Sequence, residues 1–268
     1  MREPLHFQVL SSGSQGNALL LRVADTHVLL DAGLSVRKLE QRLEQARVSP
    51  QRIDHIALTH GHLDHARAAG ALAKKSGARV HCCERLMRNA SVRRAPILTR
   101  LRVGSTSELA VQGGSSADEV LRLLPVLIPH DADPTVAFRV EHAGRALILV
   151  TDMGRVSRQA AKDLQGAHVL VLEFNHDLEL LRRGPYPDSL KRRVAGPAGH
   201  LSNEEASEML RLMTGPELHT LVLAHLSETN NTPELAHAAA QRTLTELGRS
   251  DVRILVATQH EIGPNLAV

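Results

Sequence analysis

Short apolar runs that end in histidine or aspartate constrain this chain more than any other feature of its sequence. The clearest run is Ile53–Leu58, which leads into His-Gly-His-Leu-Asp-His at residues 60–65. Three further apolar runs end beside His130, Asp152 and His225. Short apolar runs are typical of buried strands, and loops at strand ends are where a rigid sheet holds reactive side chains. We therefore expect a protein whose site collects at the ends of its strands.

Strands and helices are predicted along the whole chain, which indicates a mixed α/β protein. Apolar runs predict strands at Val28–Leu30, Ile53–Leu58, Leu121–Ile128, Val136–Val140, Ala146–Val150, Val169–Leu172, Leu221–Ala224 and Ile254–Ala257. Helical spacing of apolar residues predicts helices at Leu34–Ala46, Ala66–Lys75, Asn203–Met213 and Pro233–Leu247. Ser202 and Glu205 form a capping-box pattern at the start of the third helix. No long linker and no repeat divides the chain, so we expect residues 1–268 to form a single domain.

Composition argues against several classes of protein. Aromatic residues make up only 1% of the chain, so the stacking platforms of a dedicated single-strand-binding module are almost absent. The apolar runs are too short to cross a bilayer, and Met1–Pro4 lacks the pattern of a signal peptide. We therefore expect a cytoplasmic protein that is not embedded in a membrane. The adjacent Cys82 and Cys83 could bind metal, but such a pair without partners is more typical of a structural role.

Positive charge is concentrated in two stretches, although the formal net charge is only +3. Seven arginines and a single acid, Glu84, lie between Arg79 and Arg102. The second stretch contains Arg182, Arg183, Lys191, Arg192 and Arg193. Basic blocks are usually solvated faces, and they can also hold phosphates. The charge distribution therefore permits a nucleic-acid partner without establishing one.

The segment at residues 60–65 places three imidazoles and a carboxylate close together. Histidine and aspartate are ligands that zinc takes in catalytic sites. His60 and His62 point to one side if the backbone is extended, whereas Asp64 and His65 can turn toward a second ion where a helix begins. A two-metal site needs further ligands from distant sequence. The candidates for these are the strand-end residues His130, Asp152 and His225.

The run Thr59–His65 resembles the signature of the metallo-β-lactamase superfamily. The resemblance extends over essentially the whole chain, because later motifs follow in the expected order. Within that superfamily the closer resemblance is to the YycJ and WalJ branch. The matching segments are Ser11–Asn17, Leu30–Gly33, His130–Pro134, Leu172–Asp177, Gly184–Pro187, Gly199–Asn203 and His225–Asn231.

This resemblance implies an αββα sandwich, in which two mixed β-sheets pack face to face with helices outside. It also implies two divalent metal ions, zinc or manganese. The residues that match the family's ligands are His60, His62 and His130 for one ion and Asp64, His65 and His225 for the other, with Asp152 bridging. By the same resemblance, Asp31 is an acid that orients a ligand histidine. Every family ligand has a counterpart here, so we expect an active enzyme.

Two metal ions about 3.5–4 Å apart can make hydroxide available at neutral pH. No nucleophile beside a base is visible in the sequence, so attack by this hydroxide is the simpler mechanism. The leaving oxygen then needs a proton, and His200 resembles the phosphate-contacting histidine of ribonuclease Z and of RNase J-like nucleases. Glu173 resembles the acid that partners this histidine and can orient it. The candidate catalytic residues are therefore Asp64, His200 and Glu173.

Polar loops near the strand ends are candidates for contact with substrate. Ser14 and Asn17 lie with Gly13 in a small loop that can offer backbone N–H groups to an anion, or can form a tight turn only. Asn230, next to Asn231, can contact substrate or cap the following helix, and capping is the default expectation.

Three functions compete. A phosphodiesterase or nuclease is favoured, and the resemblance implies a DNA exonuclease, with RNA as the alternative substrate. A small-molecule hydrolase acting on a thioester, lactone or cyclic phosphodiester needs no basic groove. A regulatory protein without turnover is disfavoured by the intact ligand set. The interval between Asp152 and His225 lacks a cap insertion of the length usual in related nucleases, but a reduced cap can remain there. We expect nucleic acid as the partner. Whether the protein forms a homo-oligomer is left open.

Overall fold

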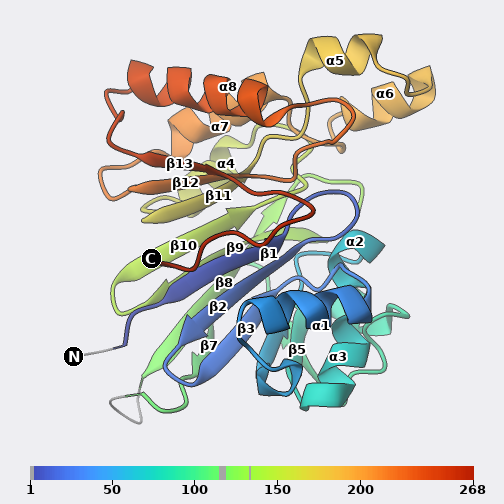
Figure 1. The fold of residues 1–268 in the computed structure, drawn as a ribbon, viewed down its shortest axis with the longest axis vertical. Helices are drawn as coiled ribbons and strands as arrows, with labels where there is room; N and C mark the ends of the chain where they lie inside the picture. Colours follow the sequence, from blue (N-terminus) through green and yellow to red (C-terminus); the bar gives the residue numbers. More distant parts are fainter. Residues whose placement is uncertain (1–2, 115–118, 133) are drawn as a thin grey trace.

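The computed structural model describes residues 3–114, 119–132 and 134–268. Across these ranges two seven-stranded β-sheets pack face to face, and helices cover their outer faces (Figure 1). The predicted αββα sandwich of two mixed sheets is therefore confirmed. Two sequence predictions reach beyond the described ranges, because residues 1–2 of the Met1–Pro4 pattern and residue 133 of the His130–Pro134 segment lie outside them.

The first sheet has the strand order β14-β1-β2-β3-β4-β5-β6. Its strands are β1 (His6–Ser11), β2 (Ala18–Val23), β3 (Thr26–Leu30), β4 (His55–Ala57), β5 (Arg79–Cys83), β6 (Ile97–Leu101) and β14 (Leu266–Ala267). Pairing is antiparallel from β14 to β3 and parallel from β3 to β6. Parallel neighbours need crossover connections. These connections contain α1 (Val36–Gln45), η1 (Pro50–Arg52), α2 (Leu63–Ala66), α3 (Ala69–Ser76) and η2 (Glu84–Arg88).

The second sheet repeats this design, with the strand order β13-β12-β11-β10-β9-β8-β7. Its strands are β7 (Ser107–Ala110), β8 (Val120–Ile128), β9 (Thr135–His142), β10 (Arg145–Val150), β11 (Val169–Glu173), β12 (Thr220–Ala224) and β13 (Arg253–Val256). Pairing is antiparallel from β7 to β10 and parallel from β10 to β13. Its crossovers contain α4 (Arg158–Asp163), α5 (Leu178–Arg183), α6 (Asp188–Val194), α7 (Asn203–Met213) and α8 (Pro233–Glu246). In Figure 1, α5 and α6 project at the upper right.

Three layers of buried, mostly aliphatic side chains hold the sandwich together. The layer between the sheets contains Phe7 and Phe138 among many leucines and valines. One outer layer packs α1 and α3 against the first sheet, and the other packs α4, α7 and α8 against the second. Each fully buried large aliphatic side chain contributes roughly 1.5–3 kcal/mol relative to an exposed one. Because the middle layer draws on both sheets, we propose a single domain over residues 1–268.

Strand pairing brings the predicted ligands to one edge of the sandwich. β10, β11 and β12 pair in parallel, so Asp152, Glu173 and His225 come to the same edge of the second sheet. β3 and β4 are likewise parallel neighbours, which places Asp31 beside the segment 60–65. The carboxyl ends of neighbouring parallel strands are where open α/β sheets build their sites.

The observed elements confirm most of the predicted ones. Every predicted strand overlaps an observed strand, and α7 has the predicted bounds and the predicted capping box. The predicted helix Ala66–Lys75 is wrong in its bounds, because one helix already begins at Leu63 and a second begins at Ala69. The strands β1, β2, β5, β6, β7 and β14 and the helices α4, α5 and α6 were not predicted.

Both cysteines are buried in strand β5. Cys82 lies in the outer layer and Cys83 in the layer between the sheets, as expected for successive residues of a strand. Burial raises the pKa of the Cys82 thiol to about 12, which disfavours the thiolate that metal binding needs. In the described part of the chain, no helix is long and apolar enough to span a membrane.

Candidate metal centre and cleft

Three of the strand-end residues adopt a backbone conformation that is rare for residues other than glycine. Asp31, Asp152 and His225 have φ angles of 62°, 60° and 55°. The amide of His225 donates a hydrogen bond of 2.8 Å to Ser12 Oγ, and the amide of Asp31 donates one of 2.9 Å to a β4 carbonyl. Residues in this left-handed conformation concentrate at functional sites, where contacts with the surroundings hold the unfavourable backbone in place.

The structure brings His60, His62 and His130 together, with their ligating atoms within 4.8 Å of one another. His60 and His62 belong to the loop that enters α2, whereas His130 follows β8 in the other sheet. Within the described chain, the Nε2 atoms of His60 and His130 are buried and have no hydrogen-bond partner. These three imidazoles therefore form one group that joins the two sheets.

A second group contains Asp64, His65, Asp152 and His225, whose ligating atoms also lie within 4.8 Å of one another. Asp152 links the two groups, because one carboxylate oxygen lies 3.1 Å from His65 Nε2 and the other lies 3.8 Å from His130 Nε2. His225 Nε2 is buried without a hydrogen-bond partner among the described residues. A third group shares Asp152 and His225 and adds Glu173 and His200.

The chemistry of these atoms fits divalent metal ions. A buried polar atom without a partner is unfavourable by roughly 1–3 kcal/mol, and several such atoms meet at this edge of the sandwich. Imidazole nitrogens with carboxylate oxygens are the donor set of zinc and related borderline ions. The residues present therefore fit divalent metal binding.

Asp31 lies behind the second group and contacts His65. Its Oδ2 atom is 2.8 Å from His65 Nδ1, and Thr59 donates to the same carboxylate through its backbone N–H, at 2.8 Å, and through its hydroxyl. A carboxylate on Nδ1 leaves Nε2 of that ring for a metal and fixes the direction of the ring. This geometry is what an acid that orients a ligand histidine requires, which is the role that the resemblance implies for Asp31.

Glu173 is fully buried and contacts two imidazoles at once. Its Oε1 atom lies 2.8 Å from His200 Nδ1 and 2.9 Å from His225 Nδ1, while Oε2 accepts a hydrogen bond of 2.9 Å from the amide of Met153. Burial alone would raise the pKa of Glu173, but His200 and His225 lower it to about 2. The side chain is thus an anion that positions both rings, and it does not itself face the cleft.

His200 lies in the loop between α6 and α7. Its amide donates a hydrogen bond of 2.9 Å to the carbonyl of Val194, at the end of α6. The preceding residue must be glycine, because a Cβ on Gly199 would lie 2.2 Å from two carbonyl oxygens of α6. Burial alone would lower the pKa of His200, but the neighbouring Glu173 carboxylate raises it. The ring is therefore held at the cleft with its Nε2 edge available.

The cleft above these residues has a volume of about 430 Å³. Its lining includes Asp64, Asp152, His225 and His200. Tyr186 and three residues of α6 also line it. This size falls in the range of roughly 300–1,000 Å³ that is usual for ligand clefts.

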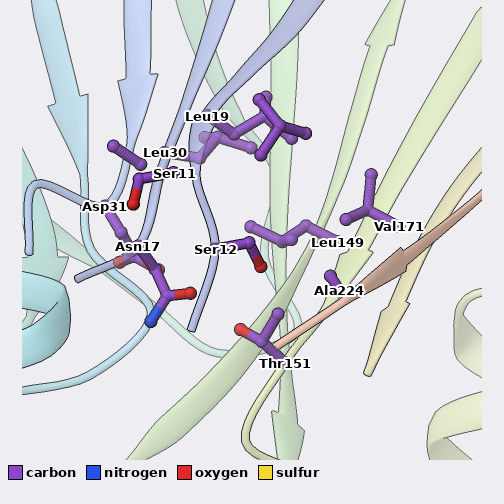
Figure 2. Close-up of a pocket in the computed structure, with 12 residues that line it drawn as sticks. Ser11, Ser12, Asn17, Leu19, Leu30, Asp31, Leu149, Thr151, Val171 and Ala224 are labelled. Atoms are coloured by element: carbon purple, nitrogen blue, oxygen red, sulfur yellow. The ribbon is translucent and has the colours of Figure 1, made fainter. Parts of the chain in front are cut away.

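A smaller cavity of about 20 Å³ lies between the sheets (Figure 2). Figure 2 shows Ser12, Asn17, Asp31 and Thr151 gathered at one side and the aliphatic side chains of the strands at the other. The cavity has room for about one water molecule and none for a substrate. The cleft, which residues of both ligand groups line, is therefore a better candidate for substrate binding than this cavity.

The predicted substrate contacts separate into two kinds. Ser14 is exposed and lines the cleft. Asn17 is buried, and its side-chain amide donates to the carbonyls of Gly13 and Asp64, so it holds the ligand loop in place instead of facing substrate. Asn230 has 0% exposure and cannot touch substrate. The capping expectation for Asn230 is also wrong, because the side chain of Thr232 caps α8.

Sequence reasoning missed two charged residues at the cleft. Asp131 Oδ1 lies 3.3 Å from the Nε2 atoms of both His62 and His130. Arg193 from α6 donates two hydrogen bonds, of 2.9 and 2.7 Å, to the other oxygen of Asp131. The adjacency of Asp131 to His130 was a usable signal, whereas Arg193 was noted only as one member of a basic stretch.

The fold and the two ligand groups define a class of protein, and comparison with known families agrees. The family described as "Metallo-beta-lactamase superfamily" matches residues 12–225, so the chain belongs to it. Among curated proteins, the chain is 34% identical over 245 residues to Exodeoxyribonuclease YycJ of Bacillus anthracis, covering 91% of this chain and 90% of that one. It is 31% identical over 240 residues to Exodeoxyribonuclease WalJ of Streptococcus pneumoniae, covering 90% and 88%.

Solved structures show the same fold at low sequence identity. The metallo-beta-lactamase fold protein YhfI of Bacillus subtilis superposes with a TM-score of 0.73 at 14% identity, covering 99% of this chain and 100% of that one. The short form of human tRNase Z superposes with a TM-score of 0.61 at 15% identity, covering 97% and 98%. These two similarities support the architecture described above.

Proposed function

We propose that this protein is a metal-dependent phosphodiesterase that degrades DNA as an exonuclease. The observation that carries the proposal is the Glu173 carboxylate shared by His225, in the ligand group, and His200, outside that group. Through this carboxylate, His200, which can transfer protons, is linked to the candidate metal centre. Curated relatives at 31–34% identity bear the name exodeoxyribonuclease, which supports the same reaction.

We infer two divalent ions, zinc or manganese. His60, His62 and His130 would hold one, and Asp64, His65 and His225 the other, with Asp152 between them. When bound, such ions lower the pKa of water and neutralise charge on a phosphate. Asp64 is part of the cleft wall, so this candidate catalytic carboxylate can also contact the water or the substrate.

The residues of the chain itself have distinct tasks in this proposal. Glu173 holds His200 through Nδ1, so that Nε2 can give a proton to the leaving oxygen. Asp31 holds His65 in the same manner. Asp31 and Glu173 are therefore positioning residues, and His200 is the catalytic residue that contacts the substrate.

Nucleic acid is the partner that fits the cleft and its surroundings. Arg192 and Arg193 are exposed on α6, and Arg193 lines the cleft. Arginine suits phosphate binding. RNA remains the alternative nucleic acid. A cytoplasmic location accords with this substrate. A homo-oligomer stays a prediction, which sedimentation analysis of the purified protein tests.

The decisive experiment offers the purified protein labelled duplex DNA, single-stranded DNA and RNA in the presence of zinc or manganese. We expect DNA to be degraded from an end, and we expect His200→Ala to remove most of this activity. His237→Ala, an exposed histidine on α8, is the matched control. If the wild-type protein cuts none of the nucleic acids but hydrolyses a thioester or lactone, the nuclease proposal is wrong.

A further inference from the structure

The segment 186–194, which contains Tyr186 and helix α6, forms part of the cleft lining. In Figure 1 it stands away from the sheets at the upper right. No residue of α6 is buried, yet Leu190 and Val194 line the cleft together with Tyr186, which precedes the helix. The segment therefore presents an apolar inner face to the cleft.

Another apolar side chain lines the cleft from α2. Leu63 belongs to the ligand loop and is 60% exposed, although it is a large aliphatic residue. An exposed apolar group beside a binding cleft is typical of ligand contact. Tyr186 and Leu63 thus add apolar surface to a cleft that imidazoles and carboxylates also line.

Charge at the end of α6 completes the pattern. The Arg193 side chain is 65% exposed even though it is bonded to Asp131, so part of its guanidinium faces solvent beside the cleft. Arginine binds phosphate through several donors at once. A ligand that matches this cleft combines an anion with a flat apolar group, which is the chemistry of a nucleotide.

We propose that Tyr186, with Leu190 and Leu63, forms a subsite for an unstacked nucleobase at the end of single-stranded DNA, and that Arg193 binds a neighbouring phosphate. This inference rests on the proposed nuclease function and specifies its substrate. A base that stacks on tyrosine is recognised by its face, so the subsite accepts all four bases. A base inside a duplex is covered by its neighbours and must be unstacked before it reaches such a cleft.

Tyr186 offers a direct measurement of this binding. It is the only tyrosine, and the chain has no tryptophan, so intrinsic fluorescence of the full chain reports on this residue alone. The probe is a single-stranded phosphorothioate oligonucleotide of mixed sequence, added to the metal-loaded protein, with its blunt duplex as comparison. Free tyrosine amide at the same oligonucleotide concentrations corrects for absorbed light. We expect saturable quenching by the single strand at concentrations at least about fivefold lower than by the duplex.

Variants test the stacking itself, with binding measured by anisotropy of a labelled oligonucleotide. Tyr186→Ala should raise Kd about 5- to 150-fold, which corresponds to the ~1–3 kcal/mol of one stacked base. Tyr186→Phe keeps the ring and should bind nearly as the wild type does. Leu178→Ala is the matched control, because Leu178 is an exposed residue of α5 that does not line this cleft.

Two results overturn the inference. One is a Tyr186→Ala protein, folded by circular dichroism, that binds the single strand as tightly as the wild type. The other is quenching by the duplex that equals quenching by the single strand. In both cases the wild type still binds DNA, and the nuclease proposal stands. If the wild type binds no nucleic acid by anisotropy, the proposed function fails together with this inference.

Discussion

Glu173 contacts two imidazoles at different places in the site. His225 is one of the proposed metal ligands, whereas His200 lines the cleft and is not one of them. One buried carboxylate thus contacts both rings and fixes their directions. At the scale of single residues, the site depends on such anions behind the histidines as much as on the histidines themselves.

The assignment of His200 as proton donor leads to a prediction about leaving groups. His200→Ala should slow DNA hydrolysis about 10²–10⁴-fold. The para-nitrophenyl ester of thymidine monophosphate should lose far less rate, because its phenolate leaves without a proton. Initial rates on both substrates, at matched metal content, provide the measurement. Equal losses on the two substrates would contradict a proton-donating role.

His81 leads to a prediction about stability. It is buried in β5, with Nε2 at 2.9 Å from His55 Nδ1, and burial lowers its pKa to about 3. The unfolded chain takes up this proton below about pH 6.5, whereas the folded chain does so only near pH 3. The contribution of neutral His81 to the free energy of unfolding is therefore complete above pH 6.5. It falls as the pH drops from there toward 3.

Within that pH window, His81 changes the free energy of unfolding by up to about 1.4 kcal/mol per pH unit. His81→Gln can keep a hydrogen bond to His55 but does not titrate. Urea unfolding at pH 7, 6 and 5 should therefore show a shallower decline for the variant than for the wild type. Parallel declines would show that His81 does not remain neutral in the folded protein.

At the scale of elements, the loop after β3 and the start of α2 are held close together. The amide of Ala32 donates a hydrogen bond of 2.7 Å to the carbonyl of His65, and the amide of Asn17 donates one of 2.7 Å to that of Asp64. A Cβ on Gly33 would lie 1.6 Å from the carbonyl oxygen of Asp64. The second ligand group therefore depends on glycine at this crossing.

Gly33→Ala should displace Asp64 and His65 and weaken zinc binding about 10- to 100-fold, the scale for losing groups that orient ligands. Gly77→Ala is the control. Its added Cβ would have nothing within 4 Å, although Gly77 itself has a positive φ, of 79°, whereas Gly33 does not. It should lower stability without changing metal affinity. Zinc titration with a competing chelator, together with thermal unfolding, separates the two effects. Unchanged zinc affinity in Gly33→Ala would refute the packing argument.

At the scale of the whole molecule, the proposed metal ligands come from both sheets. The loop at residues 60–65 follows the first sheet, whereas His130, Asp152 and His225 follow strands of the second. Cations held by these residues would join the halves of the sandwich in the native state only. A ligand at about 100 times its Kd stabilises the folded state by about 2.7 kcal/mol.

Removal of metal by chelation should therefore lower Tm by roughly 5–10 °C for a chain of this size. Re-addition of zinc or manganese should restore it, and a variant with His60→Ala and His225→Ala should respond much less to the chelator. Differential scanning calorimetry provides the measurement. An unchanged Tm after complete removal of metal would contradict cross-sheet binding.

Features set by neighbouring residues were predictable from the sequence. The bounds of α7 follow from Ser202 and Glu205, three residues apart, whose hydrogen bonds form within a single turn. The run at residues 60–65 predicted metal chemistry because its imidazoles cannot be far apart. The predicted helix Ala66–Lys75 was wrong in its bounds because the amide of Ala68 donates to the carbonyl of Ala32, which is distant in sequence.

Features that need two distant segments were decided by the tertiary structure. Arg193 and Asp131 are 62 residues apart and meet only because α6 returns over the end of β8. The same folding seals Asn230 inside the molecule and places Tyr186 on the cleft wall. The sequence by itself determined which residues can bind metal and move protons, since that depends on side-chain chemistry. Which of these residues meet was decided only by the packing of the two sheets and by the path that brings α6 to the end of β8. Such contacts depend on strand register and on close approach of the backbone.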